Sequence, residues 1–168
     1  MIEHHDERRL DTGVDHLLLR WELQAFNALT RLELYSILAA RIAVFVVEQD
    51  CPYPELDGRD VEALHLTAWL DDGEIAAYAR ILPPETRFAE PSIGRILTTR
   101  NHRGTGLGRV LVRRAIDATR SRFPDQDIRI SAQRHLGAFY GSFGFEDDSE
   151  PYDEDGIPHV DMRLASSR

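Results

Sequence analysis

The hexapeptide Arg103-Gly104-Thr105-Gly106-Leu107-Gly108 lies between a short apolar segment and the longest amphipathic segment of the chain. The segment before it, SIGRILTT (92–99), has the length and composition of a strand. Residues 106–123, which follow, repeat apolar side chains at helical spacing and stop before Pro124. This stretch therefore predicts a strand, a tight glycine turn and a helix, in that order.

A turn of this kind can bind an anion. Glycines let the chain turn tightly, and the N–H groups that open a helix converge at the positive end of its dipole. A pyrophosphate is the fitting ligand. The dipole contributes about 0.3–1 kcal/mol, or ~2 kcal/mol when partly buried, so contacts to the N–H groups must supply most of the binding. A plain connection between strand and helix is the alternative interpretation.

Two other phosphate-binding motifs do not fit the chain. A P-loop needs a lysine, and all twenty basic residues are arginine. A dinucleotide-binding fold needs a different glycine spacing, and the following strand, DIRISAQ (127–133), has no suitably placed acidic residue for a ribose. The absence of lysine also excludes Schiff-base chemistry.

The remaining segments predict a mixed α/β domain with a partly antiparallel sheet. Residues 1–16 are expected to be a flexible polar extension, and residues 17–168 a single domain. Thr30 is a candidate N-cap for the first helix. In chain order the predicted elements are a strand at 17–24, a helix at 31–47, a loop at 50–60, a hairpin of 65–70 with 74–82, strands at 92–99 and 127–133, a short helix at 135–143 and a strand at 157–165.

Charge and composition limit the function. The 168 residues carry a net charge of −9, which argues against general nucleic-acid binding. Eight arginines and one acidic residue lie between Arg95 and Arg122, so a small polyanion would be drawn to this segment. Cys51 is the only cysteine, and no metal-ligand spacing is present. No apolar run is long enough for a membrane span or a secretory signal, which predicts a cytoplasmic protein.

A second motif, AFYGSFGF (138–145), follows the glycine turn. Together the two motifs resemble the GNAT superfamily of acyl-CoA-dependent N-acyltransferases, over roughly residues 17–165. A narrower resemblance, to the ElaA-like subgroup, rests on VFVVEQDCPY (44–53), ELDG (55–58), AYARIL (77–82), IGR (93–95) and EDGIPH (154–159). The resemblance implies a GNAT fold: a single α/β domain whose mixed, mostly antiparallel sheet is splayed at its middle and flanked by helices.

The resemblance also implies acetyl-CoA as the donor and a site for it. The pantetheine arm should pair with the strand backbone at Ile96, Leu97 and Thr98, where the central strands splay apart. The ADP and pyrophosphate should lie over the six residues of the turn, Arg103, Gly104, Thr105, Gly106, Leu107 and Gly108.

Tyr140 is the predicted catalytic acid. Acyl transfer to an amine expels the CoA thiolate, and a positioned phenol can protonate the leaving sulfur, an effect typically worth ~10²–10⁴-fold in rate. The acceptor amine must lose a proton before attack, because its pKa is about 10. Glu48, His65, His159 or a chain of waters could accept that proton.

The acceptor side leaves two interpretations open. Arg41 and Arg80, with His159, could hold a carboxylate-bearing acceptor such as an amino acid; alternatively the arginines form a structural ion-pair network with Glu48, Asp57 and Asp60. Seven acidic residues between Glu146 and Asp155 would instead favour a cationic polyamine or peptide amine, unless they form a solvated hairpin.

The sequence thus predicts an enzyme that moves acetyl directly from acetyl-CoA to a primary amine of a small molecule or peptide. An acyltransferase that uses longer donors, like the acyl-homoserine lactone synthases, and a catalytically silent acyl-CoA sensor or scaffold are the alternatives. No nucleic-acid or membrane partner is expected, and a homodimer is one option for the oligomeric state.

Overall fold

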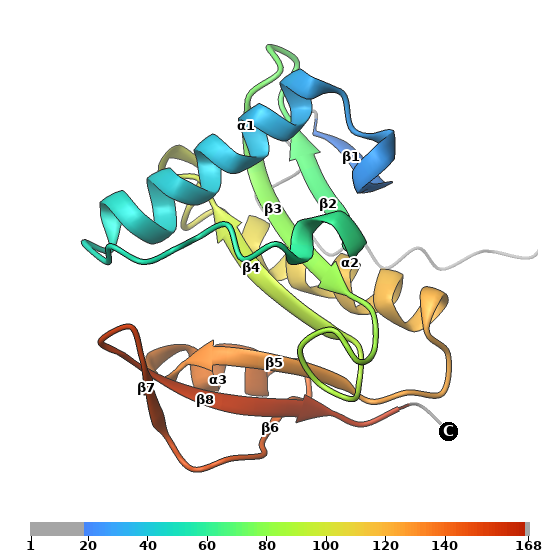
Figure 1. Ribbon diagram of the computed structural model, residues 1–168, viewed down its shortest axis with the longest axis vertical. Helices are drawn as coiled ribbons and strands as arrows, with labels where there is room; N and C mark the ends of the chain where they lie inside the picture. The colour runs from blue at the N-terminus through green and yellow to red at the C-terminus, as the bar shows by residue number, and fades with distance from the viewer. Residues whose placement is uncertain (1–18, 167–168) are drawn as a thin grey trace, which may run out of the picture.

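The structure, a computed structural model, describes residues 19–166, and its strands form one mixed sheet in the order β1-β2-β3-β4-β5-β8-β6, with β7 also pairing with β8 (Figure 1). The strands are β1 (Arg20–Ala25), β2 (Leu64–Trp69), β3 (Ile75–Leu82), β4 (Ser92–Thr98), β5 (Ile128–Gln133), β6 (Glu146–Asp147), β7 (Tyr152–Glu154) and β8 (Ile157–Leu164). The α-helices are α1 (Arg31–Arg41), α2 (Leu107–Arg122) and α3 (Gly137–Gly141). A π-helical segment, η2 (Ile42–Glu48), follows α1, and 3-10 turns are η1 (Phe26–Ala28), η3 (Arg59–Glu62), η4 (Arg100–His102) and η5 (Arg134–Leu136).

The predicted fold is confirmed, and the structure adds two short strands. β6 and β7 come from the acidic segment 146–155 and pair with β8, so this segment is a hairpin built onto the sheet. The short helix expected at 135–143 is divided into η5 and α3. The expected N-terminal extension, and the first residues of the expected strand at 17–24, lie outside the described residues.

The sheet opens between β4 and β5, which form a parallel pair with one register position, Ser92 with Arg129. All other paired strands are antiparallel, and each of these pairs has at least two register positions. Beyond Ser92 the two strands diverge (Figure 1). The edge of β4 that faces β5 therefore has no strand partner among the described residues from Gly94 onward.

A bulge in β4 lies at this opening. Tyr78 pairs with Leu97 and Arg80 pairs with Gly94, so Arg95 and Ile96 together lie opposite one residue of β3. Arg95 has a φ of 51°, a left-handed conformation that is uncommon outside glycine. Bulges bend a strand and change the direction of its side chains. This bulge gives the side chain of Arg95 a direction that regular pairing would not allow.

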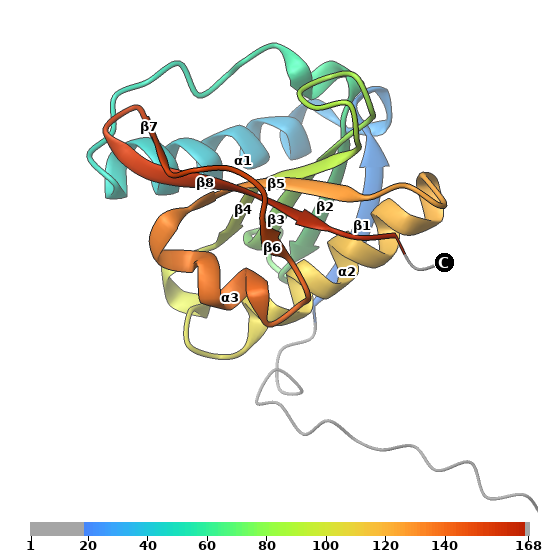
Figure 2. The same ribbon diagram turned by 90° about the horizontal axis from the view of Figure 1, so that it is seen from below.

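Helices cover both faces of the sheet: α1 lies on one face, and α2 and α3 lie on the other (Figure 2). Apolar side chains of α2 such as Leu111 and Val112 pack on the strands in the larger core, while Ile37 of α1 packs with Trp69 and Tyr78 in the smaller one. Because both faces are covered, β3 is buried along its whole length.

The first helix begins as predicted but does not continue as one α-helix. Thr30 caps it in a capping box with Glu33, which fixes its start. The prediction of a single α-helix over 31–47 is wrong in its second half, because the chain widens into a π-helix after Arg41. π-Helical turns change the direction of the side chains that follow them and occur often at functional sites. Here the side chains redirected into the opening between the strands include Val44, Phe45 and Glu48.

Candidate active site

A cleft of about 770 Å³ occupies the opening between β4 and β5. Its walls come from η2 and the loop after it, from β3, β4 and the loop between them, from β5 and α3, and from the turn between β7 and β8. The cleft therefore lies between the two halves of the sheet, and both halves contribute side chains to it.

The structure brings most of the predicted site residues to this one cleft. Eight of them line it: Glu48, Arg80, Ile96, Leu97, Thr98, Arg103, Tyr140 and His159. The other predicted residues of the glycine turn follow Arg103 and lead into the start of α2: Gly104, Thr105, Gly106, Leu107 and Gly108. His65 and Arg41 do not line the cleft.

The glycine turn has the conformation that an anion site needs. Gly104 and Gly106 have φ values of 73° and 87°, and Gly106 is the N-cap of α2. The N–H of Gly108 forms no hydrogen bond with any residue of 19–166, while the N–H of Leu107 has a 3.4 Å contact with Thr105 Oγ1. The side chain of Leu107 is buried in the core, so this residue offers only its backbone. The start of α2 thus has an N–H group, that of Gly108, without a partner among the described residues.

Tyr140 projects from α3 into the cleft and is 7% exposed. It packs edge-on against Phe139 and Phe145, with ring centroids 5.1 and 6.3 Å away. Burial raises the pKa of its phenol to about 12, because the phenolate would lose its hydration. The hydroxyl forms no hydrogen bond with any residue of the described chain. Tyr140 therefore presents a neutral phenol to the cleft.

Glu48 ends η2 at the edge of the cleft, and its carboxylate accepts a 2.8 Å hydrogen bond from Arg103 Nη1. Arg103 also donates from Nε to the carbonyl of Thr98, at 3.0 Å. Both side chains of the ion pair are partly exposed, at 29% for Glu48 and 43% for Arg103. One of the candidate bases is therefore in direct contact with the predicted donor site.

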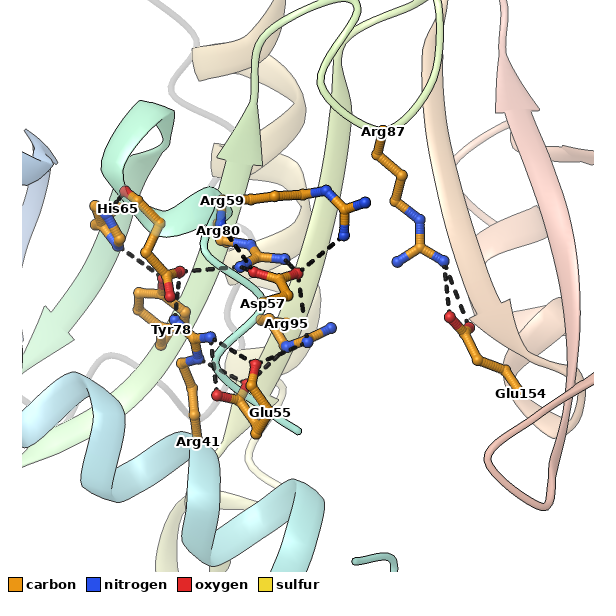
Figure 3. A network of polar contacts seen from close by, with 11 residues as sticks. Arg41, Glu55, Asp57, Arg59, His65, Tyr78, Arg80, Arg87, Arg95 and Glu154 are labelled. Carbon is orange, nitrogen blue, oxygen red and sulfur yellow. Dashed lines mark hydrogen bonds and ion pairs between the residues drawn. The ribbon is translucent and has the colours of Figure 1, made fainter. Parts of the chain in front are cut away.

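A buried ion-pair network joins α1, the loop 51–60, β3 and β4 beside the cleft (Figure 3). Arg41 is fully buried and donates to both carboxylate oxygens of Glu55, at 2.8 and 2.9 Å, and to Asp60, at 2.6 Å. These carboxylates raise the pKa of Arg41 further above its ordinary value, although burial alone would lower it. Arg41 therefore holds the loop 51–60 against α1, and the prediction that it binds substrate is wrong, because all its contacts are made inside the protein.

Arg80 belongs to the same network but forms part of the cleft wall. Its two terminal nitrogens bind Asp57 in a bidentate pair, both at 2.7 Å, and Nη1 also donates to Asp60 at 2.9 Å. Arg80 holds the pKa of Asp57 well below its usual range, against the opposing effect of burial. The expected carboxylate partners Asp57 and Asp60 are thus confirmed, whereas Glu48 is replaced by Glu55.

His65 is placed where it cannot act on a substrate, which corrects its candidacy as the base. The ring is fully buried in β2 and does not reach the cleft. Both ring nitrogens are occupied, Nδ1 with the hydroxyl of Tyr78 at 2.8 Å and Nε2 with the carbonyl of Asp60 at 3.0 Å. Burial lowers the pKa of the imidazole, so it stays neutral.

His159, from β8, does reach the cleft. Its Nδ1 lies 2.8 Å from the carbonyl of Ile157, which makes Nδ1 the protonated nitrogen of the neutral ring. Nε2 lies 3.8 Å from Glu154, and the ring stacks on Tyr152. The basic Nε2 of His159 is therefore oriented by the protein and available for a proton.

Among the cleft residues that were not predicted as site residues are three arginines, Arg59, Arg87 and Arg95. Arg87 donates to Glu154 at 3.0 Å, an ion pair between the loop after β3 and the C-terminal hairpin (Figure 3). Arg95 donates to Glu55 at 2.6 Å from the bulge. The sequence contains these arginines, but it does not show that they lie close together. Their positions depend on the loop 51–60 and on the loop between β3 and β4, and loops have no periodic sequence pattern that predicts their path.

No group of metal-ligating side chains is formed within residues 19–166. In the same residues, no helix is both long and apolar enough to cross a membrane.

Comparison with known proteins agrees with this geometry. Residues 38–166 match the family model of the acetyltransferase (GNAT) domain, so the chain belongs to the GNAT family and is an acyl-CoA N-acyltransferase by class. Within the family it is similar to protein ElaA of Escherichia coli, with 39% identity over 147 residues that cover 86% of this chain and 95% of ElaA. A UPF0039 protein of Synechocystis is 43% identical over 144 residues, which cover 86% of this chain and 94% of that protein.

Solved structures give the same result. An acyl-CoA N-acyltransferase from Pseudomonas aeruginosa is 44% identical and superposes with a TM-score of 0.84, covering 88% of this chain and 99% of that one. An acetyltransferase from Bacillus subtilis, solved in complex with CoA, is 25% identical with a TM-score of 0.57, covering 88% of this chain and 98% of that one. The resemblances drawn from the two sequence motifs are thereby confirmed at the level of family and fold.

Proposed function

We propose that the protein transfers an acetyl group from acetyl-CoA directly to a primary amine, within a complex that contains both substrates. The observation that carries this proposal is the single cleft between β4 and β5, which is bordered by the unpaired edge of β4, by Tyr140 and by Arg103. Donor and acceptor can meet there without a covalent enzyme intermediate.

The donor would lie along β4 and end at the glycine turn. The backbone of Ile96, Leu97 and Thr98 lies on the open edge and would pair with the amides of the pantetheine arm. The N–H groups at the start of α2, together with Arg103, would bind the pyrophosphate. The B. subtilis relative crystallised with CoA supports a donor of this chemical class.

In the chemical step the amine nitrogen attacks the thioester carbon, forming the N–C bond. The C–S bond then breaks, CoA leaves as a thiolate, and the thiolate takes the proton of the Tyr140 phenol. The nitrogen loses its extra proton to a base or to water, and solvent returns a proton to Tyr140. Tyr140 suits this role because its phenol faces the cleft and stays protonated at neutral pH, and the protonated phenol is the form that donates.

The base would be Glu48, His159 or a water chain bound between them. Glu48 and His159 both line the cleft, and the hydrogen bonds of Glu48 Oε2 and His159 Nδ1 leave Glu48 Oε1 and His159 Nε2 as acceptor atoms. His65 is no longer a candidate because its ring is buried behind the network.

Calorimetric titration with acetyl-CoA, CoA and NAD tests the donor half without knowledge of the acceptor. We expect micromolar binding of acetyl-CoA and CoA, and none of NAD. Failure of acetyl-CoA to bind would overturn the proposal. Titration with long-chain acyl-CoA in parallel distinguishes an acetyl donor from a longer one, and release of CoA with any amine excludes a catalytically silent module.

A further inference from the structure

Three arginines at the acceptor end of the cleft retain unused hydrogen-bond donors. Arg59, Arg87 and Arg95 extend toward the opening between the two halves of the sheet (Figure 3). Each makes its contacts through part of its guanidinium group, which leaves Nη1 of Arg87 and of Arg95, and Nε and Nη2 of Arg59, without a partner among residues 19–166. A planar guanidinium with unused donors is suited to a carboxylate.

The charges around these arginines balance, with the exception of Arg59. Three arginines of the network, 41, 80 and 95, face three carboxylates, those of Glu55, Asp57 and Asp60. Arg87 is matched by Glu154. Arg59 has only a 3.3 Å contact with Asp57, a carboxylate already held at 2.7 Å by Arg80, and its side chain is 40% exposed. Arg59 therefore contributes one positive charge that the protein does not neutralise.

The acidic segment 146–155 does not supply a cation site that would compete with this one. Asp147 pairs with Arg134, and Asp148 pairs with Arg129 and Arg163. Of the seven acidic residues, Glu154 and Asp155 line the cleft, and Glu154 is already paired with Arg87. A polyamine with several positive charges would thus find one unpaired carboxylate in the cleft, that of Asp155.

We propose that the acceptor is an amine that also carries a carboxylate, such as an amino acid, and that Arg59 binds that carboxylate. The single unpaired charge of Arg59 suits a singly charged carboxylate better than a doubly charged phosphate. Arg87 and Arg95 supply further donors on the same side of the cleft, and Asp155 would face the ammonium group as the substrate enters. This inference rests on the proposed function, since it names the substrate class of the same site.

The test uses matched acceptors. CoA release is measured with the common amino acids, each beside its carboxamide and its decarboxylated amine, and with spermidine and an aminoalkyl phosphate. The wild-type protein should show its highest kcat/KM for one or more amino acids. It should prefer them over their carboxamides by about 10- to 100-fold, the range expected for one hydrogen-bonded charge pair.

Variants assign the preference to Arg59. Arg59→Gln should abolish most of the preference for carboxylate over carboxamide by raising KM, and Arg59→Lys should retain part of it. Arg31→Gln is the matched control, because Arg31 is exposed at the start of α1 and lies away from the cleft. Its preference should equal that of the wild type.

Three results would overturn the inference: higher kcat/KM with spermidine, the phosphate or the carboxamides; turnover of no carboxylate-bearing amine; or an unchanged preference in Arg59→Gln. Calorimetry with acetyl-CoA distinguishes these results from failure of the proposed function. If the donor binds in the wild type and CoA is released with any amine, the inference about the acceptor alone is at fault.

Discussion

Glu48 Oε2 and Arg103 Nη1 lie 2.8 Å apart, which joins the end of η2 to the first residue of the glycine turn. An exposed pair of this kind contributes about 0.2–1 kcal/mol, so it is weak enough to be exchanged for a phosphate. A pyrophosphate that binds Arg103 would therefore release the carboxylate of Glu48. In the proposed reaction, donor binding and the availability of one candidate base are linked through this contact.

Removal of the Glu48 charge should strengthen donor binding. In Glu48→Gln the phosphate no longer competes with a carboxylate for Arg103, so the Kd for acetyl-CoA should fall by about two- to fivefold at low ionic strength. Calorimetry measures it, and Glu62→Gln, at a position outside the cleft, is the control. A weaker affinity in Glu48→Gln would show that Glu48 positions Arg103 instead of competing for it.

Tyr140→Phe should lower kcat by about 10²–10³-fold, within the range of general acid catalysis, and should leave the Kd for acetyl-CoA within about twofold. The phenol is the only group removed, and the edge-on aromatic contacts of the ring remain. Steady-state kinetics and calorimetry give the two values. Tyr35→Phe, on the exposed face of α1, is the matched control. Full activity in Tyr140→Phe would remove this residue from the mechanism.

The raised pKa of Tyr140 has a consequence for pH dependence. Its acid is the neutral phenol, and burial moves the loss of that proton from near 10 to about 12. Activity should therefore rise with pH as the acceptor amine loses its proton, and kcat should show no decline below about pH 11. The pH profile of kcat measures this. A decline centred near pH 10 in a protein that remains folded would contradict it.

Gly106→Asp should abolish acetyl-CoA binding. A side chain and a negative charge would stand at the N-cap of α2, where the phosphates approach, and the φ of 87° is unfavourable for aspartate. Gly73→Asp is the control, since its φ is 85° and it lies in the β2–β3 turn outside the cleft. It carries similar backbone strain and should keep the wild-type affinity. Equal affinities in both variants would contradict the phosphate site.

Arg41→Met should lower the free energy of unfolding by about 3–5 kcal/mol, because Glu55 and Asp60 would keep their burial and lose a partner. Urea denaturation followed by circular dichroism measures the change. Arg31→Met, at an exposed position, should change it by less than about 0.5 kcal/mol. A loss below about 1 kcal/mol in Arg41→Met would mean that the remaining arginines compensate for it.

Local patterns in the sequence predict the elements around the proposed donor site well. Glycines that require positive φ, a strand before them and an amphipathic helix after them are all adjacent in the chain, so Gly106 and α2 could be located from spacing alone. Tyr140 was singled out differently: the resemblance of the motif AFYGSFGF (138–145) to the GNAT family implies its role, and the structure places its side chain in the cleft.

The acceptor half could not be predicted to the same degree, because loops bring its residues together. The carboxylate that holds Arg41 is Glu55 and not Glu48, since η2 turns Glu48 toward Arg103 while the loop returns Glu55 to the helix. The sequence pattern predicts that His65 lies in a strand. It does not show that His65 is buried, because that depends on the helices and loops that cover the sheet. Both the burial of a residue and the path of a loop depend on tertiary contacts, which local sequence patterns do not record.

Donor binding in the opening between β4 and β5 would also link folding to metabolite concentration. The open edge of β4 lacks the backbone hydrogen bonds that a neighbouring strand would form. A pantetheine arm that pairs with Ile96 to Thr98 would supply hydrogen bonds of this kind. Ligand that binds the folded chain adds RT ln(1 + [L]/Kd) to its stability, about 2.7 kcal/mol at a hundredfold excess over Kd. The cellular lifetime of this protein would then follow the supply of its own donor.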